Sequence, residues 1–212
     1  MQHNEGMSTI EIHWPTTVTA EFIGDIHRIA TDIAATDEPT GFGKNPRRDD
    51  VRMWAGQAMA KVKLGGAAIC TGSVDGQVQG VATLTKAQRA LNEHSAEFGR
   101  ILTHPSARGK GLAHAMIAAQ LDRAQKLGVE TITLQLRGNN QGGIAFFHSC
   151  GFAVCGRIPN VTEFGDDRYD EVTMFIQFPP EGHVRRHGSN PDTSGGTARR
   201  AGLMTYPEET IG

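Results

Sequence analysis

The segment 95–137 constrains the fold more than any other part of the chain. Residues 95–104 have the apolar spacing of a strand and run directly into the turn Pro-Ser-Ala-Arg-Gly-Lys-Gly. A helical period of apolar residues follows over about 109–127, and Thr-Ile-Thr-Leu-Gln-Leu-Arg at 131–137 has the pattern of another strand. A strand, a helix and a strand with short links predict one βαβ crossover, in which the two strands are parallel.

The segments on both sides of this unit are expected to add antiparallel strands. Periodicity and turn residues predict, in chain order, a strand at 10–12, a helix at 18–35, a loop at 36–50, a second helix capped by Asp49 or Asp50, a hairpin of 67–71 and 78–85, a short helix through Phe146 and Phe147, a strand at 152–158, a polar loop at 159–168 and a last strand at 169–178. We therefore predict an α/β fold with a mixed, mostly antiparallel central sheet flanked by helices.

The 212 residues suggest one domain with additional terminal segments. Residues 1–8 are polar and are expected to be loose, whereas 9–178 carry all of the predicted strands and helices. Residues 179–212 are rich in Gly, Pro, Ser and Arg, and this composition favours a disordered tail because little apolar surface can be buried. His183 and His187 in the tail have a spacing that could ligate a metal, but two solvated histidines are the simpler interpretation.

Charge and cysteine usage exclude several classes of function. The formal net charge of -2 gives no global basic field for nucleic acid or an anionic membrane. The three cysteines have no C-x-x-C spacing, so they predict neither a disulfide framework nor a zinc site. There is no secretory signal pattern and no apolar run long enough to span a membrane. We expect a cytoplasmic monomer or homodimer with no metal, no nucleic-acid partner and no membrane contact.

The glycine-rich turn has the properties of an anion site. A strand that turns directly into a helix aims unpaired backbone N–H groups and the positive helix end at one point, and a diphosphate fits such a point. Gly109 and Gly111 would let a ligand approach the backbone, while Arg108 and Lys110 add positive charge. The turn taken alone is equally compatible with a glycine cap beside a solvated basic pair.

Two motifs together resemble one known family. Arg108-x-x-Gly111-x-Ala113 is similar to the (Gln/Arg)-x-x-Gly-x-(Gly/Ala) signature of the GNAT superfamily of acetyl-CoA-dependent N-acetyltransferases. The later Asn140…Phe147…Gly-Phe segment resembles that superfamily's Asn…Ala…Tyr…Gly-Phe segment. The likeness extends over about 9–178. Within the superfamily, the two segments look most like the tabtoxin-resistance acetyltransferase group.

This resemblance implies acetyl-CoA as cosubstrate and assigns its contacts. Backbone groups of Leu102 and Thr103 would pair with the pantetheine arm, and the amides of 108–113 would hold the diphosphate. Asn140 would lie near the pantetheine. The expected cofactor-binding residues are Leu102, Thr103, Arg108, Gly109, Lys110, Gly111, Leu112, Ala113, Asn140 and Phe147.

Glu97 is the expected catalytic base, because members with a catalytic glutamate carry it at the matching position of this strand. A carboxylate can take the proton that an amine must lose before it attacks. The alternative is an exposed strand carboxylate that pairs with Arg100 or Lys86. Phe147 departs from the family's tyrosine and cannot donate a proton to the leaving thiolate. His148 and Cys150 are nearby candidates for that role.

The resemblance thus implies transfer of acetyl to a primary amine by direct attack in a ternary complex. We expect a small amino-acid-like metabolite or antibiotic as acceptor, in a cavity between the loop 36–50, the second helix and the loop 159–168. Acidic residues on these loops could attract a cationic amine, although most are expected only to solvate the loops: Glu38, Asp49, Asp50, Glu163, Asp166 and Asp167. The alternatives are acetylation of a protein N-terminus or lysine, and a non-catalytic acyl-CoA-binding module.

Overall fold

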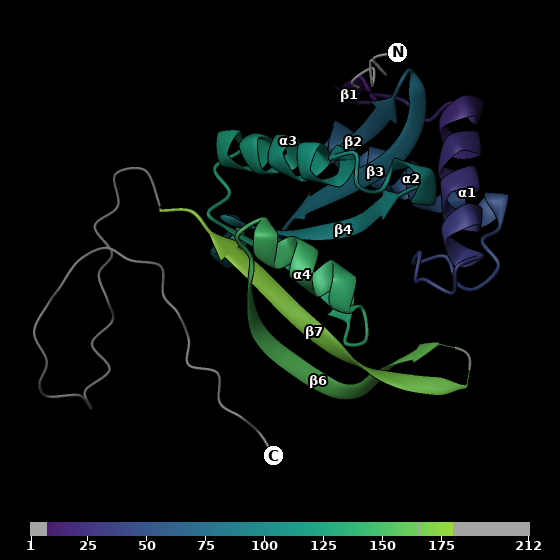
Figure 1. The fold of residues 1–212 in the computed structure, drawn as a ribbon. Coiled ribbons are helices and arrows are strands. Elements are labelled where there is room, and N and C mark those ends of the chain that lie inside the picture. Colours follow the sequence, from purple (N-terminus) through teal and green to yellow (C-terminus); the bar gives the residue numbers. More distant parts are fainter. Residues whose placement is uncertain (1–7, 165, 180–212) are drawn as a thin grey trace, which may run out of the picture. The chain divides into compact units, whose positions relative to one another are not determined.

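The computed structural model describes residues 8–164 and 166–179 (Figure 1). The chain divides into two units, residues 1–180 and 181–212, and all described residues belong to the first. Two expectations lie outside the described residues apart from residues 8 and 179: the loose start at 1–8 and the disordered tail at 179–212. The histidine pair of the tail lies outside them as well. None of the described helices is long and apolar enough to cross a membrane.

The first half of the domain contains two helices and four strands. In chain order these are β1 (Ile10–His13), α1 (Ala20–Ala34), α2 (Arg48–Lys63), β2 (Ala67–Val74), β3 (Gln77–Lys86), the short 3-10 helix η1 (Ala90–Asn92) and β4 (Ser95–Thr103). Thr19 caps α1, because its side-chain oxygen accepts from the backbone N–H of Phe22 at 3.0 Å. The β2–β3 turn is Asp75-Gly76, and both residues have the positive φ that a tight hairpin turn requires.

The second half contains the crossover and the last hairpin. Its elements are the 3-10 helix η2 (Pro105–Ala107), α3 (Leu112–Lys126), β5 (Thr131–Arg137), α4 (Gln141–Ser149), β6 (Ala153–Phe164) and β7 (Asp167–Gln177). The seven strands form one sheet in the order β1-β2-β3-β4-β5-β7-β6. Only β4 and β5 are parallel neighbours, and all the other pairs are antiparallel. This architecture confirms the predicted fold class and its one βαβ crossover.

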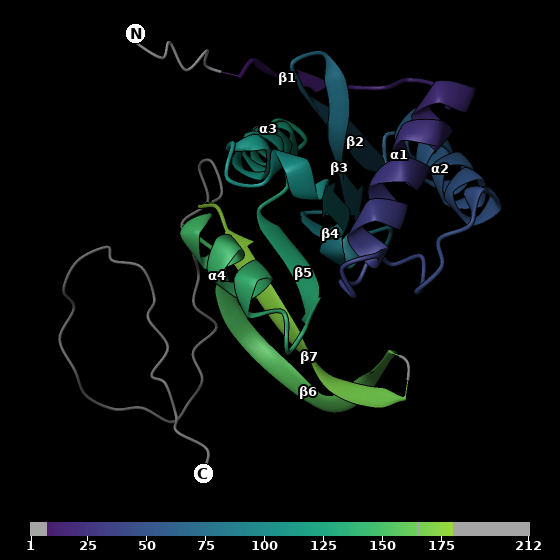
Figure 2. The ribbon, with the colours of Figure 1, turned by 45° about the vertical axis from the view of Figure 1, so that its right-hand side comes forward.

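Helices cover both faces of the sheet, as Figure 2 shows, with α1 and α2 on one side and α3 and α4 on the other. The α1/α2 face is filled by apolar side chains of both helices packed on Ile69, Val81 and Leu102. On the opposite face, α3 and α4 pack on side chains such as Leu84, Phe98 and Leu134. The alternation of side chains along each strand therefore decides which layer each residue serves.

Three details of the sequence prediction are wrong. Most of the expected polar loop 159–168 is strand, because β6 continues to Phe164 and β7 begins at Asp167, with these two residues paired. Its alternating polar residues have the composition of a loop, and the ladder is interrupted between Ile158 and Thr162. The cap of α2 is Arg47, without a side-chain bond, whereas Asp49 and Asp50 lie in the first turn. Helix α3 begins at Leu112, later than expected, because the glycine turn precedes it.

Candidate functional site

The parallel strands β4 and β5 separate, and a large cleft opens where they part. Their pairing comprises only three residue pairs and ends at Glu97 opposite Thr133. Beyond this point β4 runs on beside β3 while β5 runs on beside β7, so the facing edge of β4 has no ladder partner. The cleft has a volume of about 980 Å³, and its lining includes the second half of β4, the end of β5, the start of α4 and residues 38–41.

A β-bulge in β4 decides which side chains face the cleft. Ala82 pairs with Ile101 and Leu84 with Phe98, so β4 has one residue more than β3 over this interval. Phe98 and Ile101 pack under α3 and α4, whereas Leu102 packs under α1 and α2. The extra residue turns Arg100 onto the α1/α2 face, where its guanidinium contacts aromatic rings of that layer.

Glu97 lines the cleft and is exposed. It lies opposite Thr85 of β3 and Thr133 of β5, at the last rung before the strands part. Within the described residues the Glu97 carboxylate makes no hydrogen bond or ion pair. The expected alternative partners are engaged elsewhere: Lys86 donates to the carbonyl of Leu127 at 3.1 Å, and Arg100 donates to the carbonyl of Gly41.

Arg100 holds the loop that follows α1. Its guanidinium carbon lies 4.1 Å from the ring centre of Phe42 and 5.3 Å from that of Trp54, and Nη2 donates to the Gly41 carbonyl at 2.7 Å. The Nε atom is buried without a hydrogen-bond partner. Burial lowers the pKa of the Arg100 guanidinium. No carboxylate of the described residues lies within ion-pair distance of this group.

The turn before α3 has the geometry that its glycines suggested. Gly109 and Gly111 adopt φ angles of 73° and 86°, and Gly111 is the N-cap of α3. The first intrahelical bond runs from the amide of Ala115 to the carbonyl of Gly111, so the three preceding amides have no acceptor within the helix. A Cβ added at Gly109 would meet nothing within 4 Å. The amides of Arg108 and Lys110 already donate to the carbonyls of Pro105 and Ala107, so the donors that remain for an anion are the other amides of the turn and of the helix start.

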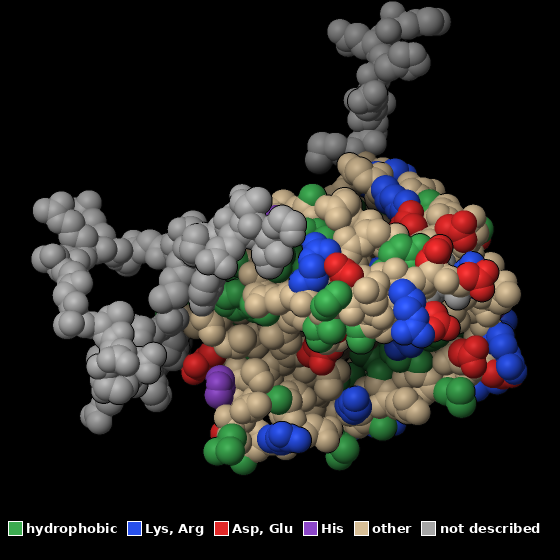
Figure 3. Space-filling model, turned by 90° about the horizontal axis from the view of Figure 1, so that it is seen from below, with side chains coloured by type: hydrophobic (Ala, Val, Ile, Leu, Met, Phe, Trp, Pro, Cys, Tyr) green, Lys and Arg blue, Asp and Glu red, His purple; other side chains and the backbone are tan. Residues whose placement is uncertain are grey.

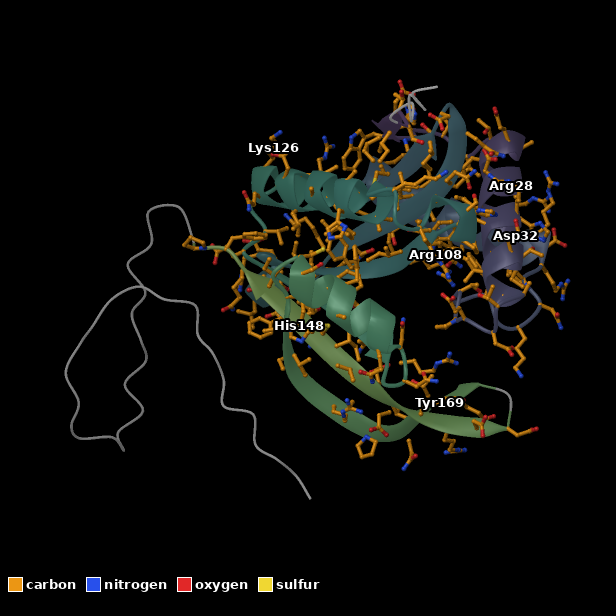
Figure 4. The ribbon with its side chains drawn as sticks, in the orientation of Figure 1. Arg28, Asp32, Arg108, Lys126, His148 and Tyr169 are labelled. Carbon is orange, nitrogen blue, oxygen red and sulfur yellow. The ribbon has the colours of Figure 1, made fainter. Side chains whose placement is uncertain are left out.

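The arginine of the turn is already paired. Both terminal nitrogens of Arg108 donate to the carboxylate of Glu38, at 2.8 and 2.9 Å, and both side chains are about half exposed. Figure 4 shows Arg108 where the start of α3 approaches the end of α1. Glu38 also lines the cleft, so one of the acidic loop residues reaches the site. Among the other five, Asp49 pairs with Arg52, and none lines the cleft.

His104 links the start of the glycine turn to α1. Its Nδ1 accepts from the backbone N–H of Ser106 at 3.1 Å, which leaves the proton on Nε2. Nε2 lies 2.8 Å from a carboxylate oxygen of Asp32 on α1. A side chain that the sequence showed only as part of a strand end therefore links α1 to the start of the glycine turn.

The start of α4 forms the opposite wall. Asn140 caps α4, because its Oδ1 accepts from the amide of Gly143 at 2.9 Å, and it lines the cleft. Phe147 is 4 % exposed and packs edge-on against Phe146 and Phe152 while reaching the cleft wall. His148, labelled in Figure 4, is exposed and does not line the cleft.

The structure brings most of the predicted site residues together. Those that line the cleft are Glu97, Leu102, Thr103, Arg108, Ala113, Asn140 and Phe147. Gly109, Lys110, Gly111 and Leu112 lie at the turn beside it, and the side chain of Leu112, the first residue of α3, is fully buried in the core. The expected cavity wall from α2 is not part of this cleft. That helix lines a separate cavity of about 230 Å³.

Several cleft residues had no sequence signal as site residues. They are contributed by β4, by β5 and the turn after it, and by the last hairpin, and they include Arg100, Gln135, Arg137, Asn139, Thr162 and Glu171. Arg137 stacks over the ring of Tyr169 at 4.7 Å. Acidic and basic side chains are interspersed on the face in Figure 3. The lining of the cleft itself includes Glu97 and Glu171 as well as Arg100 and Arg137.

Comparison with known proteins assigns the family. Residues 26–152 match the model of the acetyltransferase (GNAT) family, which is more than half of the chain, and the chain belongs to this family. The L-methionine sulfoximine/L-methionine sulfone acetyltransferase of Salmonella typhimurium is 30% identical over 93 residues, which are 43% of this chain and 50% of the relative. The [ribosomal protein bS18]-alanine N-acetyltransferase of Escherichia coli is 29% identical over 96 residues, 45% of this chain and 64% of the relative.

Solved structures share the fold. The Salmonella typhimurium protein yncA, solved with its cofactor acetyl-CoA, superposes with a TM-score of 0.68 at 20% identity, over 85% of this chain and 99% of that one. The chain spans only about half to two thirds of the length of the two curated relatives above.

Proposed function

We propose that this chain transfers an acetyl group from acetyl-CoA to the primary amine of a small, amino-acid-like molecule. The observation that carries the proposal is the continuous cleft between β4 and β5, which has the glycine turn at one side and Glu97 at the other. The resemblance to the tabtoxin-resistance group and the methionine sulfoximine/sulfone acetyltransferase relative favour a small acceptor, whereas the ribosomal-protein-alanine relative supports a protein N-terminus as the alternative.

The residues of the cleft fit acetyl-CoA. The turn at 108–113 would hold the diphosphate through the amides that open α3, which have no intrahelical acceptor. The unpaired edge of β4 at Leu102 and Thr103 would bind the pantetheine as an added strand does. Asn140 keeps its Nδ2 for a ligand, since its Oδ1 is the helix cap. When bound, acetyl-CoA supplies the acetyl carbon to which the amine nitrogen bonds and a thiolate that leaves as the carbon–sulfur bond breaks.

Glu97 is the proposed general base. An ammonium group must lose a proton before its nitrogen can attack, and a carboxylate that reaches it directly or through one water can take that proton. Because Glu97 is exposed to the cleft and has no partner among the described residues, its oxygens are available as acceptors. Neither candidate for the acid, His148 or Cys150, lines the cleft in the described part of the chain, so the proposal assigns no side chain to protonate the leaving thiolate.

The experiment on catalysis is thiol release from acetyl-CoA with a panel of amines. Glu97→Gln preserves shape and removes basicity, so kcat/KM should fall roughly 10²-fold or more at pH 7, consistent with loss of a general base. The defect should shrink at higher pH, where more amine is already neutral. Glu93→Gln is the matched control, because Glu93 is exposed just before β4 and lies outside the cleft. Near-native turnover by Glu97→Gln would remove Glu97 from the mechanism.

The experiment on the cofactor uses two glycines with the same backbone requirement. Gly111 and Gly128 have φ angles of 86° and 71°, and a Cβ at either would meet little or nothing nearby. Gly111→Ala and Gly128→Ala should therefore lower the free energy of unfolding by similar amounts. Only Gly111→Ala should weaken acetyl-CoA binding, by several-fold or more in calorimetry. Equal affinities in the two variants would contradict the diphosphate site. Acetyl-CoA binding without turnover of any amine would indicate a binding module instead.

A further inference from the structure

We propose that Arg100 binds a carboxylate of the acceptor, so that the acceptor is an amino acid whose amine faces Glu97. The proposal rests on the N-acetyltransferase activity proposed above and names a specificity-determining residue within it. Three features of the described residues support it: the missing anion beside Arg100, its position relative to Glu97, and the fixed orientation of its guanidinium.

The first feature is a half-buried cation without an anion. A charge removed from water is costly unless it is paired, and arginine is rarely left so. Among the described residues, the guanidinium of Arg100 has the Gly41 carbonyl as its one hydrogen-bond acceptor and no carboxylate within ion-pair distance. Arg108, the arginine of the glycine turn, differs because its guanidinium already donates to the carboxylate of Glu38 at 2.8 Å. A carboxylate from the cleft would supply what Arg100 lacks.

The second feature is the bulge. Without it, strict alternation would place Glu97 and Arg100 on opposite faces of β4. The extra residue opposite Thr83 brings both side chains to the α1/α2 face, and both line the same cleft. Their Cα atoms are at most about 10 Å apart, because a strand rises roughly 3.3 Å per residue. One small molecule that carries an ammonium and a carboxylate can therefore reach both.

The third feature is preorganisation. Stacking on Phe42 and the contact with Trp54 fix the plane of the guanidinium before a ligand binds. Because Nε is buried and Nη2 donates to Gly41, Nη1 is the donor left for a carboxylate. A flexible cation would lose more conformational entropy on binding the same anion. The aromatic layer thus holds Arg100 in place before the acceptor arrives.

A purely structural role for Arg100 makes a different prediction. If Arg100 only anchors the loop at Gly41, its loss should affect all acceptors alike, whether or not they carry a carboxylate. If it binds the carboxylate, its loss should affect only acceptors that have one. The test is therefore a pair of acceptors that differ in this group alone.

The experiment measures thiol release with the twenty L-amino acids and L-methionine sulfone, each compared with its primary carboxamide. For the wild-type chain, kcat/KM should be at least about 30-fold higher for the acid than for the amide, since an unpaired buried charge is costly. In Arg100→Gln this ratio should fall to within a few-fold of one, through a higher KM for the acid and an unchanged KM for the amide. Arg100→Lys should recover part of the ratio, and the exposed Arg52→Gln should keep all of it.

Several outcomes would overturn the inference. A wild-type enzyme that acetylates amides as well as acids, or only amines without a carboxylate, excludes a carboxylate site while leaving the N-acetyltransferase proposal standing. An unchanged acid-to-amide ratio in Arg100→Gln excludes Arg100 as the residue that binds the carboxylate. Loss of the ratio in Arg137→Gln instead excludes it as well. Acetyl-CoA affinity, measured by calorimetry, shows whether each variant is folded. Should no amine be acetylated at all, the proposed function itself fails.

Discussion

Gly99 at the bulge of β4 provides a test of the geometry on which the acceptor site depends. A Cβ at this position would lie 2.5 Å from Oγ1 of Thr83 and 3.7 Å from its Cβ. Thr83 is only 5% exposed, and a β-branched side chain has few alternative rotamers, so the overlap cannot be relieved cheaply. Gly99→Ala should therefore destabilise the protein by about 1–3 kcal/mol, the usual cost of overpacking. This cost exceeds the ~0.4–1 kcal/mol that alanine gains through the unfolded state.

The companion substitution makes the explanation specific. Thr83→Ala removes Oγ1 and leaves a Cβ at 3.7 Å, an ordinary contact, so the double variant should regain most of what Gly99→Ala lost. Urea unfolding of the two single variants and the double variant should give a coupling free energy of about 1 kcal/mol or more. Gly99→Ala should also lower the acid-to-amide ratio of acceptors, because Arg100 is displaced. Additive effects, or a neutral Gly99→Ala, would refute the steric reasoning.

The remaining predictions concern other contacts. Glu38→Gln should tighten acetyl-CoA binding by up to about fivefold in calorimetry, because a half-exposed ion pair is worth ~1 kcal/mol at most and its loss frees Arg108 for the diphosphate; weaker binding would contradict this. Burial raises the pKa of the Cys70 thiol to about 11, so a thiol reagent at pH 8 should label the exposed Cys155 first and Cys70 only on unfolding, which mass spectrometry of the labelled peptides can show. A chain that ends at Pro179 should keep its melting temperature, whereas one that ends at Gln177 should melt at a lower temperature. The reason is Phe178, whose amide donates to the backbone carbonyl of Glu130 at 2.8 Å and whose ring packs on the core. Equal melting temperatures of the two truncated chains would show that these contacts of Phe178 contribute nothing to stability.

Local sequence signals were sufficient for most of the fold. The crossover could be predicted because each of its parts has a strong period and a clear boundary, such as Gly128 after α3. The distal ends of β6 and β7 could not, since they extend beyond the helices that cover the sheet (Figure 1) and their polar residues resemble a loop. Strand pairing there is decided by the partner strand, with Thr162 opposite Tyr169, and no local pattern reports it.

Some features of the candidate site could likewise be predicted from the sequence, and others depend on the tertiary structure. Sequence determined the glycine turn and the β4 segment, because backbone requirements at a turn are local and restrict the residue type. Asn140 was expected near the pantetheine through the family resemblance, and its role as the cap of α4 comes from the structure. Tertiary structure alone decided that Glu97 is unpaired, that Arg108 meets Glu38, and that a one-residue bulge opposite Thr83 turns Arg100 toward the cleft. Strand alternation is a rule of period two, so a single extra residue reverses it, and only the register between neighbouring strands records where that residue lies.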